Sequence, residues 1–519
     1  MRTNFLMFIV DQLCASHLGC YGNTVIETPN IDGLSARGWQ ASASYVATPI
    51  CMPNRASLMT GRMPSSHGVR HNGLPLGLEN ITFPELMRQA GYATAHIGKS
   101  HLQTMTNQQP IPNPLRPKRE KDGKQRFPGD YRQESVDNWM DADYPMTLPY
   151  YGFEQAEIAI EHGDDINGHY RGWLRQQGVD DAALLGRENA LPTDYELAKV
   201  GQAWRTRVPE ALHPTAWVAS RTCDLLEEYA AQDKPFFLHC SFPDPHHPYT
   251  PPGQYWNKYR PEDMTLPTSY HSPSPPPHLA WLRAQRDAGC AHKTSMACFA
   301  ASEREVQEAL ALNYGSISFI DAQIGQVLRT LSQLGLADNT VVIFTADHGE
   351  FGGDHQLLFK GSLHYQSLIR TPFIWSDPQR PTQAQNTSLL STIDIAPTLL
   401  ERAGVAACNG MQGRSFLPAI EGGSYTEREM LLLEEEGQRI YFGFDAPVRM
   451  RTLLTPRYRL SVYENATWGE LYDRETDPTE STNLWDAPVC QTLKNTLLQN
   501  LLRESIAYPD SSLSPLAVA

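Results

Sequence analysis

Unbroken apolar runs of strand length recur along this chain and limit the folds that are open to it. The first, residues 4–10 with the sequence Asn-Phe-Leu-Met-Phe-Ile-Val, shows no alternation of apolar and polar side chains. A strand of this kind is buried on both faces, as in a parallel sheet that helices cover on each side. Comparable runs lie at residues 93–98, 235–240, 340–345 and 372–375. We therefore predict a large, mostly parallel central sheet.

Helical segments separate these runs, and the clearest spans residues 314–334. Its apolar side chains fall on one helical face: Ile317, Ile320, Ile324, Val327, Leu328 and Leu331. Alternation of strands and helices is typical of α/β layered folds. After Gly404 the alternation weakens, and residues 448–463 predict an antiparallel hairpin. We expect an α/β catalytic domain over residues 1–404 and a smaller C-terminal subdomain with an antiparallel sheet and a tail over residues 405–519.

Two stretches interrupt this order, at about residues 103–151 and 272–305. The first is rich in proline and charge, and the second opens with Ser-Pro-Ser-Pro-Pro-Pro. Segments of such composition seldom build a hydrophobic core. They are long for loops in a compact domain, so we interpret them as lids or subunit contacts. The second stretch and the C-terminal tail are the places where we would look for contacts in a homo-oligomer.

Composition excludes several classes of function. The chain has 519 residues and a formal net charge of −15, from 43 Lys and Arg against 58 Asp and Glu, which argues against binding to nucleic acid or anionic membranes. Its nine cysteines are odd in number and lack paired spacing, so we expect no disulfide scaffold. The N-terminal apolar run is shorter than a signal-peptide core, and no long apolar span follows. We expect a cytoplasmic protein without a membrane segment.

Hard metal ligands follow two of the predicted strands. Asp11 comes directly after the first run, and Asp347 and His348 follow the run at residues 340–345. In open α/β sheets, ligands collect at the carboxyl ends of the strands. A single divalent cation can join these two clusters, where it would polarise a substrate oxygen as a Lewis acid.

The segment from Cys51 to Arg62 carries the most specific motif, Cys-x-Pro-x-Arg followed by Ala-Ser-Leu-Met-Thr-Gly-Arg. It resembles the signature of the type I, formylglycine-dependent sulfatases of the alkaline phosphatase superfamily. In that family a maturation enzyme oxidises the cysteine to formylglycine. The resemblance implies that Cys51 is the precursor of the nucleophile. The alternative interpretation is a buried free cysteine beside the start of a helix.

The chemistry implied by this resemblance is covalent catalysis with a built-in exit. The hydrated aldehyde of formylglycine has two hydroxyl groups. One displaces the alcohol at sulfur, and deprotonation of the other restores the aldehyde and releases sulfate. A serine could perform only the first of these steps.

Further motifs extend the resemblance to most of the chain. Residues 91–102 match a second sulfatase signature, Gly-Lys-x-His, which implies that Lys99 binds a sulfate oxygen and His101 contacts the aldehyde hydrate. The proline-rich loop at residues 242–252 resembles the family's Pro-His-x-Pro loop. It offers His246 as a ligand of the sulfate or leaving oxygen and as a general acid, with His247 as the fallback.

Three other residues gain roles from the resemblance. Lys360 matches the lysine that neutralises charge on the sulfate or leaving group. Arg55, in the Cys-x-Pro-x-Arg motif, is expected to support the aldehyde and the metal-bound oxygens through its planar fork. Asn72 stands where relatives place an asparagine near the substrate, although His-Asn-Gly is also an ordinary turn.

The implied metal ligands depart from the common family pattern at two positions. The resemblance assigns Asp11, Asp347, His348 and the oxygen derived from Cys51 to the metal, with Gln12 as a possible ligand. Many members have two adjacent aspartates where this chain has Asp11-Gln12, and Asp-Asn where it has Asp347-His348. An imidazole ligand shifts preference from Ca²⁺ toward Mn²⁺. Similar substitutions occur in the choline-sulfatase and phosphonate-monoester-hydrolase branches.

The resemblance thus implies an alkaline-phosphatase-like fold and an arylsulfatase-like sulfuric ester hydrolase that acts on a small anionic sulfate ester. A phosphonate monoester or phosphodiester hydrolase with the same nucleophile is the alternative, and a metal-binding relative without activity is a remote one. The pair of Lys99 and His101 favours sulfate esters, because the phosphonate hydrolases of the family lack it.

Overall fold

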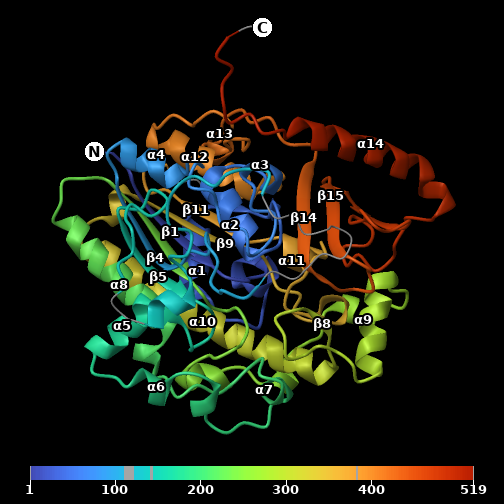
Figure 1. Ribbon diagram of the computed structural model, residues 1–519, viewed down its shortest axis with the longest axis horizontal. Coiled ribbons are helices and arrows are strands. Elements are labelled where there is room, and N and C mark those ends of the chain that lie inside the picture. Colours follow the sequence, from blue (N-terminus) through green and yellow to red (C-terminus); the bar gives the residue numbers. More distant parts are fainter. Residues whose placement is uncertain (1, 110–121, 141–143, 381–383, 518–519) are drawn as a thin grey trace.

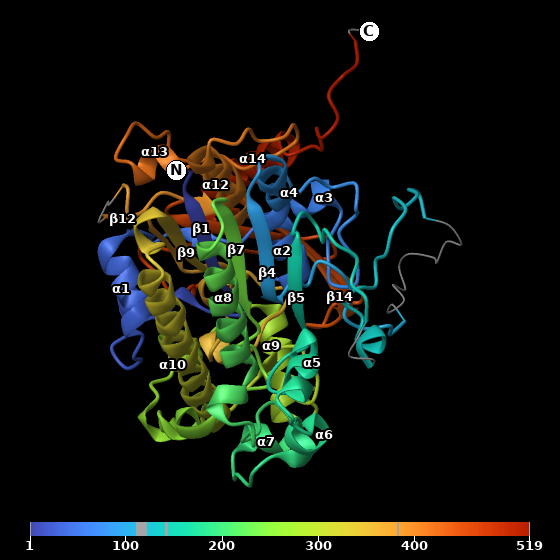
Figure 2. The same ribbon diagram turned by 90° about the vertical axis from the view of Figure 1, so that its left-hand side faces the viewer.

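A nine-stranded, mostly parallel sheet forms the centre of the computed structural model, which describes residues 2–109, 122–140, 144–380 and 384–517 (Figures 1 and 2). Its strands lie in the order β12-β2-β11-β9-β1-β7-β4-β5-β6. The neighbours from β9 to β5 are all parallel. The bounds are β1 (Asn4–Val10), β2 (Trp39–Ala41), β4 (Ala93–Lys99), β5 (Gln155–Ile160), β6 (Asn167–Gly168), β7 (Phe236–Phe242), β9 (Thr340–Ala346), β11 (Phe373–Ser376) and β12 (Ala384–Asn386).

Helices cover the sheet on both faces. The bounds are α1 (Pro29–Arg37), α2 (Cys51–Thr60), α3 (Pro64–His67), α4 (Phe83–Gln89), α5 (His169–Gln176), α6 (Asp181–Leu184), α7 (Glu196–Lys199), α8 (Pro214–Ala230), α9 (Pro277–Asp287), α10 (Glu303–Gln333), α11 (Gln366–Ile369), α12 (Ile395–Ala403), α13 (Leu417–Ile420) and α14 (Gln491–Ala507). Helices α8 and α10 pack side by side (Figure 2). Within the described residues, no helix is both long and apolar enough to cross a membrane.

The packing of strand β1 explains why neither of its faces is polar. Its residues alternate between two hydrophobic clusters. Leu6, Phe8 and Val10 pack with α8 and α10, whereas Phe5, Met7 and Ile9 pack with α2, α4 and α12. Because both faces of the strand are buried, both sets of side chains must be apolar. The predicted α/β sandwich is confirmed.

A four-stranded antiparallel sheet forms the C-terminal part, with the predicted hairpin at its centre (Figure 1). Its strands are β14 (Leu431–Ile440), β15 (Pro447–Leu454), β16 (Tyr458–Tyr463) and β17 (Gly469–Asp473). Short two-residue strands pair elsewhere, β3 (Ser44–Tyr45) with β13 (Leu390–Ser391) and β8 (Phe299–Ala300) with β10 (Leu357–Leu358).

Three elements differ from the expectation. The run at residues 372–375 forms β11, but this strand is antiparallel to β9. The helix expected at 314–334 begins earlier, at Glu303, where Ser302 and Glu305 form a capping box. The second proline-rich stretch, 272–305, contains α9, whose Leu279 and Leu282 are buried in a hydrophobic cluster. The expectation that this stretch builds no core is wrong for α9.

The first proline-rich stretch also contributes buried side chains. Trp139 and Met105 pack with Ile158 and Ile160 of β5. Residues 110–121 and 141–143 of this stretch lie outside the described residues.

Candidate active site

Each of the five parallel strands has a candidate site residue at or just beyond its carboxyl end. Asp11 follows β1, Asp347 follows β9, and Lys99 is the last residue of β4. His246 lies on the loop after β7, and His162 lies two residues beyond β5. The carboxyl ends of parallel strands meet at one edge of the sheet, so residues far apart in the sequence converge there.

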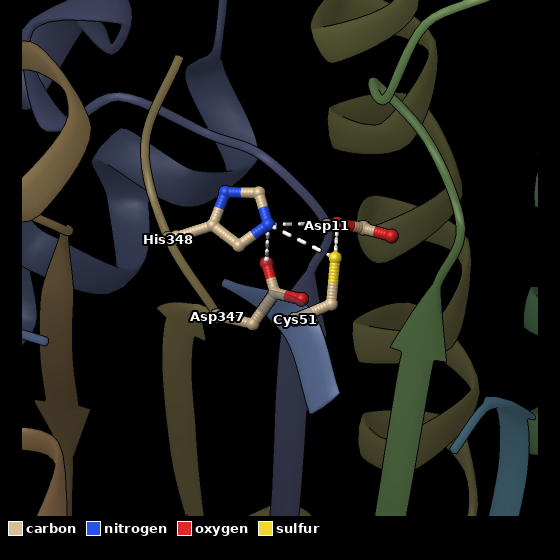
Figure 3. Close-up of side chains that lie close together, drawn as sticks. All are labelled: Asp11, Cys51, Asp347 and His348. Carbon is tan, nitrogen blue, oxygen red and sulfur yellow. Dashed lines mark hydrogen bonds and ion pairs between the residues drawn. The ribbon is translucent and has the colours of Figure 1, made fainter. Parts of the chain in front are cut away.

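Cys51 is the first residue of α2, and its side chain points toward Asp11, Asp347 and His348 (Figure 3). Its side chain is 1% exposed. The sulfur lies 3.1 Å from His348 Nε2, 2.7 Å from Lys360 Nζ and 3.8 Å from Asp11 Oδ1. Burial and Asp11 raise the pKa of the thiol, but Lys360, Lys99 and His348 outweigh them and hold it below its usual value.

Cys51 and three side chains around it form a candidate metal centre. Donor atoms of Asp11, Cys51, Asp347 and His348 all lie within 4.8 Å of one another. His348 Nε2 is 3.6 Å from Asp11 Oδ1 and 3.7 Å from Asp347 Oδ1. The other ring nitrogen of His348 donates to the Gly349 carbonyl at 2.9 Å, which turns Nε2 toward the cluster. Carboxylate and imidazole donors suit a hard or borderline divalent cation.

Gln12 supplies a test of whether a cation fits. Its backbone takes a φ of 65°, and its backbone N–H donates to Asp347 Oδ1 at 3.0 Å. Its side-chain nitrogen donates to Glu350 and lies 3.1 Å from His247 Nδ1. Within the described residues, its buried Oε1 has no hydrogen-bond partner. A buried acceptor without a donor is rare, and a cation at the neighbouring carboxylates would satisfy it. The residues therefore fit a divalent metal.

Two buried ammonium groups flank the cluster. Lys99 Nζ donates to Asp11 and lies 2.5 Å from His162 Nε2. Lys360 Nζ lies 2.8 Å from His246 Nε2. Burial raises the pKa of the Asp11 carboxyl, but Lys99 above all, then Lys360 and Arg55, hold it well below its usual value. Asp11 is therefore ionised in the folded protein at neutral pH.

Arg55 lies one helical turn after Cys51 and binds three segments. Its Nε donates to Asp347 Oδ2 at 2.8 Å, and its Nη1 donates to the Lys99 carbonyl at 2.6 Å and to Ser241 Oγ at 3.0 Å. Its Nη2 is buried without a partner among the described residues. The guanidinium therefore keeps one donor free for a ligand.

Histidines form the other side of the site. The rings of His162 and His246 stack with centroids 3.7 Å apart, and His247 stacks on Phe359 at 3.6 Å. Nδ1 of His246 donates to the His247 carbonyl, so its Nε2 accepts from Lys360. Burial lowers the pKa of His246 well below its usual value, and His162 and Lys360 lower it further.

The segments of His101 and Asn72 are held near the site by hydrogen bonds that involve backbone N–H groups. Glu134 accepts the backbone N–H groups of residues 101, 102 and 103 at 2.7, 2.9 and 3.0 Å, and His101 has a φ of 55°. Asn72 Oδ1 accepts the backbone N–H of Met52 at 3.2 Å, at the start of α2. Within the described residues, no hydrogen bond joins the side chain of His101 or Asn72 to Cys51.

Three residues near the site were not predicted from the sequence: His162, Glu350 and Glu134. None belongs to a recognisable motif. The position of His162 just after the short apolar run at residues 158–160 is the only sequence signal for it. A cavity of about 690 Å³ lies beside His162, with Glu161, Asn167 and Trp204 among its lining residues.

Buried ammonium and guanidinium groups around Cys51 provide a setting in which anionic oxygens can bind. The α/β fold and this site therefore define a hydrolase of anionic esters. The family model for sulfatases matches residues 3–405, and a second model, N-sulphoglucosamine sulphohydrolase, C-terminal, matches residues 353–507. The chain belongs to the sulfatase family, and it is a sulfuric ester hydrolase.

Individual relatives agree with this assignment. The chain is 29% identical to an arylsulfatase of Clostridium perfringens over 493 residues, which cover 93% of this chain and 90% of that protein. It is 25% identical to a choline-sulfatase of Rhizobium meliloti, over 94% of this chain and 83% of that protein. The fold is similar to that of the phosphonate monoester hydrolase of Agrobacterium radiobacter, with a TM-score of 0.79, 24% identity and coverage of 99% and 97%.

Proposed function

We propose that this protein hydrolyses a sulfate monoester to an alcohol or phenol and inorganic sulfate, with Cys51 in its formylglycine form as the nucleophile. The observation that carries the proposal is the position of the Cys51 sulfur, 2.7 Å from the Lys360 ammonium and 3.1 Å from the His348 imidazole. This cysteine belongs to the Cys-x-Pro-x-Arg motif, so a formylglycine-generating maturation enzyme is the implied partner.

Asp11, Asp347 and His348, with residue 51 and possibly with Gln12, would hold one divalent cation, Ca²⁺ or Mn²⁺. When bound, the cation supplies Lewis-acid polarisation of a sulfate oxygen and acidifies the hydrate at residue 51. The formylglycine hydrate supplies two hydroxyl groups, one for attack and one for release. Arg55 orients this set because it fixes Asp347 at 2.8 Å.

Positive charge from the chain itself would bind the sulfate group. Lys99 donates to Asp11, and Lys360 lies against His246 and the Cys51 sulfur. Their ammonium groups can donate to sulfate oxygens, and Arg55 Nη2 is a further unused donor. Such donors stabilise the charge that develops in the transition state, because they are already oriented in a site that excludes water.

Proton transfer to the leaving alcohol is assigned to His246. Its Nε2 lies 2.8 Å from the Lys360 ammonium, which also lies 2.7 Å from the Cys51 sulfur. Burial keeps the ring neutral in the free protein. Binding of the sulfate anion favours the protonated ring, which can then act as the general acid. His101 is assigned to contact the aldehyde hydrate at residue 51, and Asn72 is assigned to bind the substrate.

A second candidate function is hydrolysis of phosphonate monoesters or phosphodiesters. The observation that favours it is the metal set itself, in which Gln12 and His348 replace acidic and amide residues. A tetrahedral phosphonate of similar size would fit the same donors.

The test compares initial rates for 4-nitrophenyl sulfate and a 4-nitrophenyl phosphonate monoester, with enzyme coexpressed with the maturation enzyme and supplied with Mn²⁺ or Ca²⁺. The mass of the peptide that contains Cys51 gives the fraction oxidised. We expect faster turnover of the sulfate, in proportion to that fraction. A faster phosphonate reaction would establish the second candidate, and full activity with an unmodified thiol would exclude the formylglycine mechanism.

A further inference from the structure

Strand β14 carries three consecutive glutamates, Glu434, Glu435 and Glu436, and all three are buried. Glutamate is seldom buried without a partner, so each needs an explanation. Glu434 accepts the backbone N–H and the hydroxyl of Ser65, both at 2.8 Å. Glu436 forms ion pairs with Arg70 and Arg449. Glu435 forms no ion pair within the described residues.

Glu435 instead joins two segments that carry site residues. Its Oε2 accepts the hydroxyl of Thr48 at 2.9 Å, and its Oε1 accepts the hydroxyl of Ser362 at 2.9 Å. Thr48 lies three residues before Cys51, and Ser362 lies two residues after Lys360. One carboxyl group thus binds the segment of the nucleophile with one oxygen and the segment of the lysine with the other.

The Lys360 segment has no helix or strand of its own to fix it relative to the Cys51 segment. Lys360 lies in the stretch between β10, which ends at Leu358, and α11, which begins at Gln366, so no helix or strand holds its backbone. The contact of 2.7 Å between Lys360 Nζ and the Cys51 sulfur joins groups 309 residues apart in the sequence. A shift of about 1 Å between reacting groups can cost roughly 100-fold in rate.

Other contacts make the C-terminal sheet a rigid base for this arrangement. The backbone N–H of Glu434 donates to the Ala47 carbonyl at 2.9 Å, so β14 also binds the Cys51 segment through its main chain. Leu431 and Leu433 of the same strand pack against Val46 and Ile369. A side chain on a packed strand is well suited to fix two loops relative to each other.

We propose that Glu435 is a positioning residue that holds the Cys51 segment and the Lys360 segment in register for catalysis. The proposal rests on the proposed function, because it assigns both segments to the catalytic site. It gives the C-terminal sheet a part in the reaction, through the two segments that Glu435 binds.

The test uses three variants of the full-length, oxidised enzyme with 4-nitrophenyl sulfate. Glu435→Ala removes both hydrogen bonds, and we expect kcat to fall about 10- to 100-fold with little change in KM. Glu435→Gln keeps an acceptor and gains a donor that either hydroxyl can accept, so it should restore kcat to within about 5-fold of the wild type. Glu434→Ala is the control on the neighbouring position of β14, because it loses two part-buried hydrogen bonds to Ser65 and an ion pair with Arg451 but no contact with Thr48 or Ser362. A loss in Glu435→Ala no greater than in Glu434→Ala would overturn the proposal.

A second measurement serves if Glu435→Ala does not fold, and it separates this proposal from the function. Thr48→Val and Ser362→Ala are combined in a double-mutant cycle that is read in the midpoint of thermal unfolding, which needs no turnover. Non-additive shifts would support the link through Glu435, and additive shifts would overturn it. If the shifts are non-additive but the oxidised, metal-supplied wild type hydrolyses no sulfate ester, the proposed function is overturned and the link through Glu435 is not.

Discussion

The buried side chain of Arg55 binds several hydrogen-bond partners at once. The guanidinium is 1% exposed and binds Asp347, the Lys99 carbonyl and Ser241 through two of its nitrogens. Only a planar fork with several donors can do this and still offer a free N–H to a ligand. The same arginine is part of the Cys-x-Pro-x-Arg motif, so the sequence feature and the geometry meet in one side chain.

Replacing Arg55 by lysine keeps the charge but loses the fork. We expect kcat for the sulfate ester to fall about 100- to 1,000-fold per oxidised site, because Asp347 and the ligand lose oriented donors. The rate must be divided by the fraction of Cys51 oxidised, measured by peptide mass, since the change lies inside the maturation motif. Arg70→Lys, at an ion pair with a 41% exposed arginine side chain, is the control. A rate per oxidised site close to that of the wild type would contradict the role of Arg55.

Some of the residue positions could be read from the sequence and others could not. Asp11, Cys51, Lys99, Asp347 and Lys360 stand in motifs or directly after apolar runs, and the fold brings them together. Glu435 has no local signature, and the signals for His162 and Glu350, positions shortly after β5 and after His348, are weak. Their importance depends on which distant segment the fold places against them, and no pattern of neighbouring residues carries that information.

At the scale of elements, the loop after β4 depends on a carboxyl group from another segment. Glu134 accepts three consecutive backbone N–H groups, at residues 101–103, and also the hydroxyl of Tyr150. This contact holds His101 in its left-handed backbone conformation. The proline-rich stretch expected to be a lid therefore also supports the site.

Glu134→Ala should release this loop. We expect kcat to fall about 10- to 100-fold, because the backbone that presents His101 and Lys99 loses three hydrogen bonds. Asp137→Ala, at an exposed carboxylate in the same stretch, should leave kcat within about 2-fold. The comparison is made by steady-state kinetics, with circular dichroism to verify the fold. Equal rates for the two variants would show that Glu134 has no part in holding the loop.

The elements themselves were only partly predictable. Parallel strands such as β1 and β7 can be recognised in the sequence because burial on both faces leaves no regular alternation of apolar and polar residues. The apolar run of β11 looks the same, and nothing in its four residues specifies that it runs antiparallel to β9. Direction depends on where the connecting segments lead, and that is decided by tertiary packing.

At the scale of the whole molecule, the N-terminal and C-terminal parts share their cores. Ala47 and Met63 are buried in one cluster with four leucines of the C-terminal sheet, Leu432, Leu453, Leu460 and Leu471. Tyr45 and Val46 are buried in another with Leu431, Leu433 and Leu454. The segment just before Cys51 is therefore covered on one side by the C-terminal sheet.

A chain that ends at residue 404 should consequently lose both its activity and its solubility. It would expose both apolar clusters and lose Glu435, so we expect aggregation instead of an active smaller enzyme. The measurements are soluble yield and hydrolysis of the sulfate ester. A chain that ends at residue 512 retains α14 and the sheet and should behave like the wild type. Activity in the shorter chain would show that the residues before 405 form an independent enzyme.

Because Cys51 is almost completely buried in the folded protein, the time at which the site closes during synthesis limits when this cysteine can be modified. Its contact with Lys360 joins residues 309 positions apart, and a ribosome adding roughly 5–20 residues per second needs about 15–60 s to cover that distance. During that interval the cysteine has been synthesised but the loops that enclose it have not. If Cys51 is oxidised as proposed, the maturation enzyme has this window to act, before folding closes the site.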